Sequence, residues 1–213
     1  MIGYLLSLLL SGAVAVLGIE ALAEYLGATE FTPLLRQLLP FFLSIPLCMT
    51  SASSCAISME GKNFWQLQVL PLKASDVYKS KLLWNLALAT PFYLLSVILL
   101  LFRVRPDVLT APHYIVLPLV FLLFSIVLGL FTNLHFPVLN WDNEARVVKQ
   151  SAAVLISMLV GIVAILIPTV IAVGLQLENY TLFFIATELI FLIVTAILDL
   201  LMSKKELINI RQS

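Results

Sequence analysis

Residues 57–83 read ISMEGKNFWQLQVLPLKASDVYKSKLL, and this stretch determines how the rest of the chain is interpreted. It is a charged, aromatic segment broken by a proline, and a long apolar run lies on either side of it. Of the 213 residues, 62% are hydrophobic and only 11% are charged, whereas soluble domains carry roughly 25% charged residues. So few charges do not cover a water-facing surface, and the bilayer is therefore predicted to be the main solvent.

The apolar runs are long enough to be membrane spans, because a helix needs about 20 predominantly apolar residues to cross the hydrocarbon core. Six stretches meet this condition: about 2–23, 34–56, 82–102, 114–134, 152–176 and 181–202. The runs are continuous, without the alternation of barrel strands, and prolines inside several of them predict kinked helices. We expect one all-α domain over residues 1–213, a polytopic membrane helix bundle with six transmembrane helices.

The basic residues predict the orientation of this bundle, since lysine and arginine concentrate in cytoplasmic loops. Nine of the twelve fall on one side: Lys62, Lys73, Lys79, Lys81, Arg146, Lys149, Lys204, Lys205 and Arg211. The other three, Arg36, Arg103 and Arg105, fall on the opposite side. Both termini and the two long polar loops, 57–81 and 135–151, are therefore predicted to be cytoplasmic.

The first cytoplasmic loop is predicted to contain a short amphipathic helix. Ser58 can cap its N-terminus, and apolar residues then recur at three-residue spacing: Phe64, Leu67 and Leu70. The Leu70–Pro71 pair should end this helix, and Ser75–Asp76 should begin the next one. The alternative is an interfacial loop whose lysines only fix the topology.

Two motifs in the cytoplasmic loops resemble those of ABC-type exporter permeases, the integral membrane subunits of ATP-driven exporters. Such permeases commonly carry an acidic residue and glycine, then a leucine–proline pair, then a lysine that opens the third helix; here these are Glu60–Gly61, Leu70–Pro71 and Lys81. The stretch EGKNFWQLQVLP, residues 60–71, is similar to the EGK-x-x-W-x-L-x-x-LP pattern of a Firmicute-type subgroup. Residues 136–151 also resemble the segment between the fourth and fifth helices of that subgroup, in the C-terminal half of its longer members.

This resemblance implies a transporter subunit of a bacterial cell membrane, in which residues 58–71 form a coupling helix that binds a separate ATP-hydrolysing subunit. The residues carried over to that contact are Glu60, Gly61, Lys62, Phe64, Trp65, Leu67, Leu70 and Pro71. Phe64, Trp65 and Leu67 would be the buried anchors, with Glu60 and Lys62 at the rim. The implied partners are an ATP-binding-cassette ATPase subunit, a second permease half and membrane lipid, and the zero net charge argues against nucleic acid. The alternatives are a non-transporting assembly or regulatory subunit, or a truncated half of a larger permease.

The chain itself is not expected to be an enzyme or to hold a cofactor or metal. The phosphate-binding motif G-x-x-x-x-G-K-[ST] fails around Gly61–Lys62, so ATP must be hydrolysed on another subunit. An intramembrane enzyme built on Glu20, Glu24 and Glu188 is a third alternative.

Glu188 is a buried-charge candidate, because it lies about seven residues into the sixth span, where an unpaired charge is costly. It is predicted either to line a translocation path or to pair with Arg36, Arg103 or Arg105. Two polar residues within the spans, Asn85 and Asn133, are expected to hydrogen-bond between helices.

Overall fold

The computed structural model describes residues 2–25, 27, 29–49, 52–71, 73–143, 147–148, 151–175 and 180–204, and every regular element in these residues is helical. The long helices are α1 (Ile2–Leu17), α3 (Thr32–Cys48), α5 (Ala74–Val104), α6 (Ala111–His135), α8 (Ala152–Leu175) and α9 (Thr181–Ser203). The short elements are α2 (Ile19–Tyr25), α4 (Phe64–Val69), and the 3-10 turns η1 (Thr29–Phe31), η2 (Ser53–Cys55) and η3 (Ser58–Asn63).

The prediction of an all-α chain with apolar spans is confirmed at the level of length and composition. Among the described residues, five helical segments are long and apolar enough to cross a membrane, or six if α1 and α2 together make one bent span. These helices define the class of protein, a multi-pass membrane helix bundle. The last four predicted spans each fall inside one helix of the structure or exceed it by a single residue.

Two predicted spans differ from the structure. The second, 34–56, extends past the end of α3 at Cys48 and includes the 3-10 turn η2. The first, the apolar run 2–23, is not one continuous helix. The chain turns by 99° between α1 and α2, at Gly18, which adopts a positive φ of 86°. Glycine adopts this conformation without the steric cost that a side chain brings. Arg103 also lies against this glycine, and a Cβ there would sit 2.8 Å from the Arg103 Nη2 atom. The first span therefore consists of a 16-residue helix followed by a short helix across the end of the bundle.

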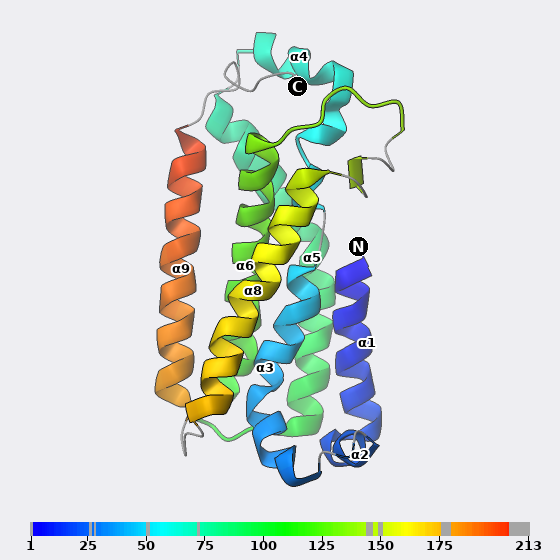
Figure 1. The fold of residues 1–213 in the computed structure, drawn as a ribbon, viewed down its shortest axis with the longest axis vertical. Helices are drawn as coiled ribbons and strands as arrows, with labels where there is room; N and C mark the ends of the chain where they lie inside the picture. The colour runs from blue at the N-terminus through cyan, green and yellow to red at the C-terminus, as the bar shows by residue number, and fades with distance from the viewer. Residues whose placement is uncertain are drawn as a thin grey trace.

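Helix α6 is the centre of the bundle and packs against α3, α5, α8 and α9 (Figure 1). Helix α1 packs against α3 and α5, whereas α9 stands at one edge and contacts mainly α6. The close approach of η2 to α6 depends on Gly129, where a Cβ would lie 2.1 Å from the Ser53 hydroxyl oxygen. Helices α2 and α4 lie at opposite ends of the bundle and run across it.

The buried interior contains small hydroxyl side chains that link the helices, as is common in membrane bundles. The hydroxyls of Ser54 in η2 and Ser157 in α8 hydrogen-bond at 2.6 Å. The hydroxyl oxygens of Ser7 in α1 and Ser96 in α5 lie 3.4 Å apart, within hydrogen-bond distance. The predicted prolines do lie inside helices, in α3, α5, α6 and α8.

Candidate functional site

The candidate site is the elbow, residues 57–71, which comprises η3 and α4 and projects from one end of the bundle (Figure 1). Its first residues are held by Asn133, near the end of α6, which is fully buried. The Asn133 side-chain oxygen accepts hydrogen bonds from the backbone N–H groups of Ile57, at 2.7 Å, and Ser58, at 3.0 Å. Its amide donates to the Ser58 hydroxyl oxygen at 2.6 Å, and the backbone N–H of Val138 donates to the same oxygen at 3.0 Å.

This network corrects the expected role of Ser58. The sequence predicts that the Ser58 hydroxyl caps a helix, but Ile57 occupies the cap position of η3 and no side chain caps it. The hydroxyl oxygen instead accepts hydrogen bonds from the Asn133 amide and the Val138 backbone N–H. A buried polar group without a hydrogen-bond partner would cost free energy. The expected hydrogen bond between helices is found for Asn133, which joins α6 to Ser58 of η3. For Asn85 the expectation is wrong, because its amide donates to the Lys81 carbonyl within α5.

The second fixed point of the elbow is the contact between Gly61 and Trp141. Gly61 has φ 53° and ψ −134°, a conformation that glycine adopts and other residues avoid. The Trp141 ring covers it so closely that a Cβ on Gly61 would lie 3.0 Å from two ring carbons. The Trp141 indole N–H donates to the Ser58 carbonyl at 2.7 Å. The two sequence motifs, 60–71 and 136–151, are therefore in direct contact.

Charged side chains make two further links from the elbow, and they differ in burial. Glu60 forms an ion pair with Lys81 of α5, and both side chains are partly buried. The Lys62 Nζ atom lies 4.0 Å from the Asp142 Oδ1 atom, but both side chains are exposed, so this ion pair contributes little to stability. Glu60 thus joins the elbow to α5.

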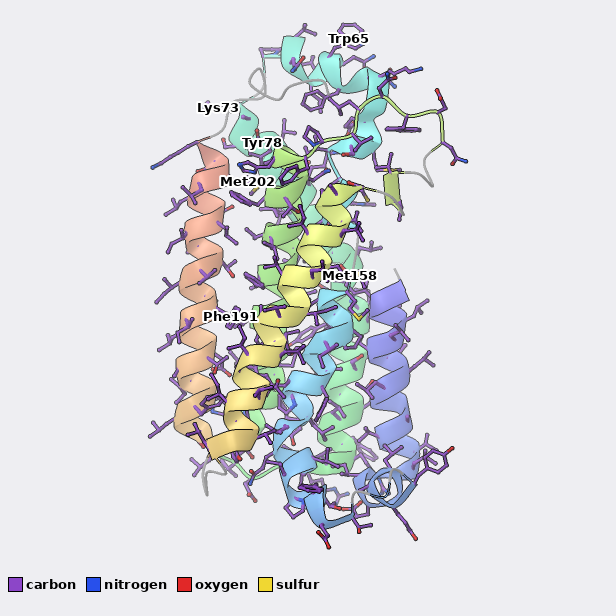
Figure 2. The ribbon with its side chains drawn as sticks, in the orientation of Figure 1. Trp65, Lys73, Tyr78, Met158, Phe191 and Met202 are labelled. Carbon is purple, nitrogen blue, oxygen red and sulfur yellow. The ribbon has the colours of Figure 1, made fainter. Side chains whose placement is uncertain are left out.

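The apolar residues of the elbow separate into an inner and an outer set. Phe64 is only 1% exposed and packs in a cluster of residues from the start of the elbow, α5, α6, the loop after α6, and α9: Ile57, Val77, Tyr78, Leu130, Leu134, Leu139 and Met202. Leu67 is partly buried against this cluster. Figure 2 shows Tyr78 and Met202 on the bundle side of the elbow.

The outer set is Trp65, Val69 and Leu70, which are 53%, 70% and 49% exposed. Trp65 lies on the outer side of α4, away from the bundle (Figure 2). The sequence-based assignment of Phe64 as an anchor for a partner therefore needs revision, because Phe64 lies inside this chain. Trp65 and Val69, one helical turn apart, are the exposed apolar residues of α4.

The end of the elbow is as the sequence predicts. Leu70 leaves the helical region, with ψ 144°, and α4 ends at Val69 immediately before the exposed Leu70–Pro71 pair. Helix α5 then begins at Ala74 with Asp76 in its first turn, although Lys73 rather than Ser75 is the cap residue. The Leu70–Pro71 pair, at the end of the elbow, therefore separates α4 from α5.

Glu188, the predicted buried charge, lies far from the elbow in α9 and pairs with His113 of α6 at 2.8 Å. The two side chains are 10% and 7% exposed, and the His113 ring lies 5.2 Å from that of Phe184. Within the described residues, Arg36 pairs with Glu20 at 2.8 Å, so the expected pairing of Glu188 with an arginine is replaced by one with histidine. A nearby cavity of about 500 Å³, lined by Arg36, Arg105 and Phe184, is not lined by Glu188.

The pairing of Glu188 with His113 leads to a prediction for stability. Glu188→Ala and His113→Ala should each lower the free energy of unfolding, because each leaves the other side chain buried without its partner. The double variant should lose less than the sum of the two, by about 1–3 kcal/mol. Thermal unfolding in detergent measures this cycle, with the exposed Glu24→Ala as the control that should change little. Strictly additive losses would show that the pair does not contribute.

Sequence reasoning did not find that Trp141 and Ser58 position the elbow. The available signal was the presence of polar or amphipathic residues, Ser58, Asn133 and Trp141, at the ends of apolar runs, where they are costly unless paired. Comparisons with protein-family models, with curated proteins and with solved structures found no match for this chain.

Proposed function

We propose that this chain is the membrane-spanning permease subunit of an ATP-binding-cassette exporter in a bacterial cell membrane, and that the elbow docks on a separate ATPase subunit. The observation that carries the proposal is the combination of an exposed apolar face with a firmly held base. Trp65 and Val69 project from α4, while Asn133, Trp141 and Lys81 hold the segment that bears them.

A coupling element must transmit displacement to the membrane helices, and this requires that it does not move independently of them. The elbow meets this condition through a different contact to each of three long helices. Asn133 links it to α6 by hydrogen bonds, Lys81 links it to α5 by an ion pair, and Phe64 lies in the same buried cluster as Met202 of α9. A push on α4 is therefore expected to reach α5, α6 and α9 together.

The exposed face is suited to a protein partner. Large aromatic residues at the centre of an interface commonly supply most of the binding free energy, while surrounding charges set orientation. Trp65 is such an aromatic residue, and the exposed Lys62 precedes it by three residues in the sequence. In this proposal a second permease half would complete the pathway, and ATP would be hydrolysed outside the chain.

The test is the double variant Trp65→Ala, Val69→Ala. Both side chains are exposed, so insertion and thermal stability should be unchanged, whereas recovery of the ATPase subunit with the tagged permease should fall by about tenfold or more. The matched control is Val108→Ala, Leu109→Ala, two exposed apolar residues at the opposite end of the bundle. Quantitative mass spectrometry of the purified complex gives the recovery. Equal recovery from both double variants would rule out the elbow as the docking site.

A further inference from the structure

A groove on the membrane-facing side of the bundle lies between α5 and α9, with α6 as its floor, and has a volume of about 480 Å³. Its walls are aliphatic over most of their length, with Leu82 and Leu86 on α5 and Leu192 on α9. The volume falls in the range of about 300–1,000 Å³ that is typical of small-molecule sites. This part of the groove offers an apolar surface and no charge.

The end of the groove nearest α4 is different, because a lysine and an aspartate line it. Lys79 comes from the second turn of α5, and Asp199 from the last turns of α9. Neither residue takes part in an ion pair within the described part of the chain, in contrast to Lys81, which pairs with Glu60. The hydroxyl of Thr195, which also lines the groove, already donates to a carbonyl of its own helix. Recognition of a polar group here therefore depends on one positive and one negative charge.

The depth of these charges matches the headgroup layer of a bilayer. Trp84, 72% exposed, lies five residues further along α5, or about 7.5 Å along the helix axis. Exposed tryptophans concentrate at the boundary between headgroups and hydrocarbon, and each headgroup layer is roughly 5–8 Å thick. Lys79 and Asp199 are thus at headgroup level when the aliphatic part of the groove is at the level of the acyl chains.

We propose that this groove binds a zwitterionic phospholipid from the leaflet on the α4 side, of the phosphoethanolamine class. Its phosphate would lie against Lys79, its ammonium group against Asp199, and one acyl chain in the groove over α6. An anionic lipid without an amine would meet the Asp199 carboxylate with no compensating charge. An apolar helix of a second copy would cover both charged groups without a counterion, which is costly. Charge complementarity therefore selects the zwitterion.

The experiment uses the full-length chain alone in mild detergent, equilibrated with equal amounts of palmitoyl-oleoyl phosphatidylethanolamine and phosphatidylglycerol, with retained lipids counted by native mass spectrometry. Phosphatidylethanolamine should be retained over phosphatidylglycerol by about fivefold. Lys79→Ala should lower the retention of both lipids, because both carry the phosphate that Lys79 would bind, and the preference set by Asp199 should remain. Asp199→Ala should reverse the preference toward phosphatidylglycerol. The charge-exchanged variant Lys79→Asp, Asp199→Lys should restore it, which distinguishes recognition from damage to folding. Lys73→Ala, an exposed lysine outside the groove, is the matched control.

A second pair of variants tests the acyl-chain part of the site. Ala196→Trp fills the groove and should reduce phosphatidylethanolamine retention by at least the same factor, whereas Ile193→Trp, on the exposed surface of α9 outside the groove, should not. Equal retention of the two lipids, retention unaffected by Ala196→Trp, or a dimer that is lost in the groove variants would each overturn the proposal. Because no ATPase is present, these outcomes are independent of the docking role proposed for the elbow.

Discussion

Replacing Gly61 with alanine is expected to detach the elbow from the bundle. The backbone at Gly61 has a positive φ combined with a strongly negative ψ, and holding another residue there costs about 1–3 kcal/mol. The new methyl group would also lie 3.0 Å from the Trp141 ring, an overpacking that typically costs a further 1–3 kcal/mol or so. The elbow should therefore open more readily than in the wild type, by about 2–6 kcal/mol.

Hydrogen–deuterium exchange of residues 57–71 measures this opening directly. An increase of 30-fold or more in the exchange rate of the protected amides is expected, since about 2 kcal/mol corresponds to roughly that factor. Gly174→Ala is the matched control, because a Cβ at Gly174 in α8 meets no atom within 4 Å. If Gly61→Ala leaves exchange in the elbow at the wild-type rate, the contact with Trp141 does not hold this segment.

The dihedral and the steric contributions at Gly61 are separable. Trp141→Ala removes the ring that the new methyl group would meet, but it leaves the backbone dihedrals of residue 61 unfavourable for alanine. It also removes the hydrogen bond to the Ser58 carbonyl, so Trp141→Ala alone should accelerate exchange in the elbow. Adding Gly61→Ala to Trp141→Ala should then cost only the dihedral part. A loss as large as in the wild-type background would show that the ring contact contributes nothing.

The second large effect is expected for Asn133→Ala. This substitution removes the acceptor of the Ile57 and Ser58 N–H groups, in a position where Asn133 is fully buried. A buried donor left without a partner costs about 1–3 kcal/mol, so the two together predict a loss of about 2–6 kcal/mol. The Ser58 hydroxyl loses a donor as well, and the start of the elbow should no longer be fixed to α6.

Thermal unfolding in detergent and exchange of the elbow amides test this prediction together. Asn85→Ala is the control, since Asn85 is also buried but makes one hydrogen bond within its own helix. Asn133→Asp retains the acceptor oxygen and should recover part of the loss. An alanine variant at Asn133 as stable as the one at Asn85, with unchanged exchange in the elbow, would contradict the role assigned to this network.

Both predictions concern the base of the elbow and not its exposed face, and this separates them from the docking test. Gly61→Ala or Asn133→Ala should leave the exposed side chains of Trp65 and Val69 on α4 unchanged. Each should weaken the attachment of α4 to α6. If the elbow couples an ATPase to the bundle, such variants are expected to bind the partner while transmitting its motion poorly. Variants of the exposed face should show the opposite, a stable elbow with weak binding.

The sequence by itself determined the class of protein and most of the helix positions. Apolar runs of about 20 residues are incompatible with a water-facing surface, so their number and length place most of the helices, although not the break at Gly18. Local rules also sufficed at Leu70–Pro71, because a residue before proline avoids the helical conformation regardless of the surrounding fold. The three-residue spacing of Phe64, Leu67 and Leu70 likewise indicated an amphipathic segment.

Only the tertiary structure decided which side of that segment is buried and what holds it. Phe64 is inside and Trp65 outside because residues from α5, α6 and α9, with Val77 and Met202 at the extremes, converge beneath α4. The tertiary structure also decided the partners of two polar side chains. The Ser58 hydroxyl binds Asn133 instead of capping a helix, and Glu188 pairs with His113 of another helix. Spacing along the chain predicts local conformation, but the partner of a buried polar group depends on which helices the packing brings together.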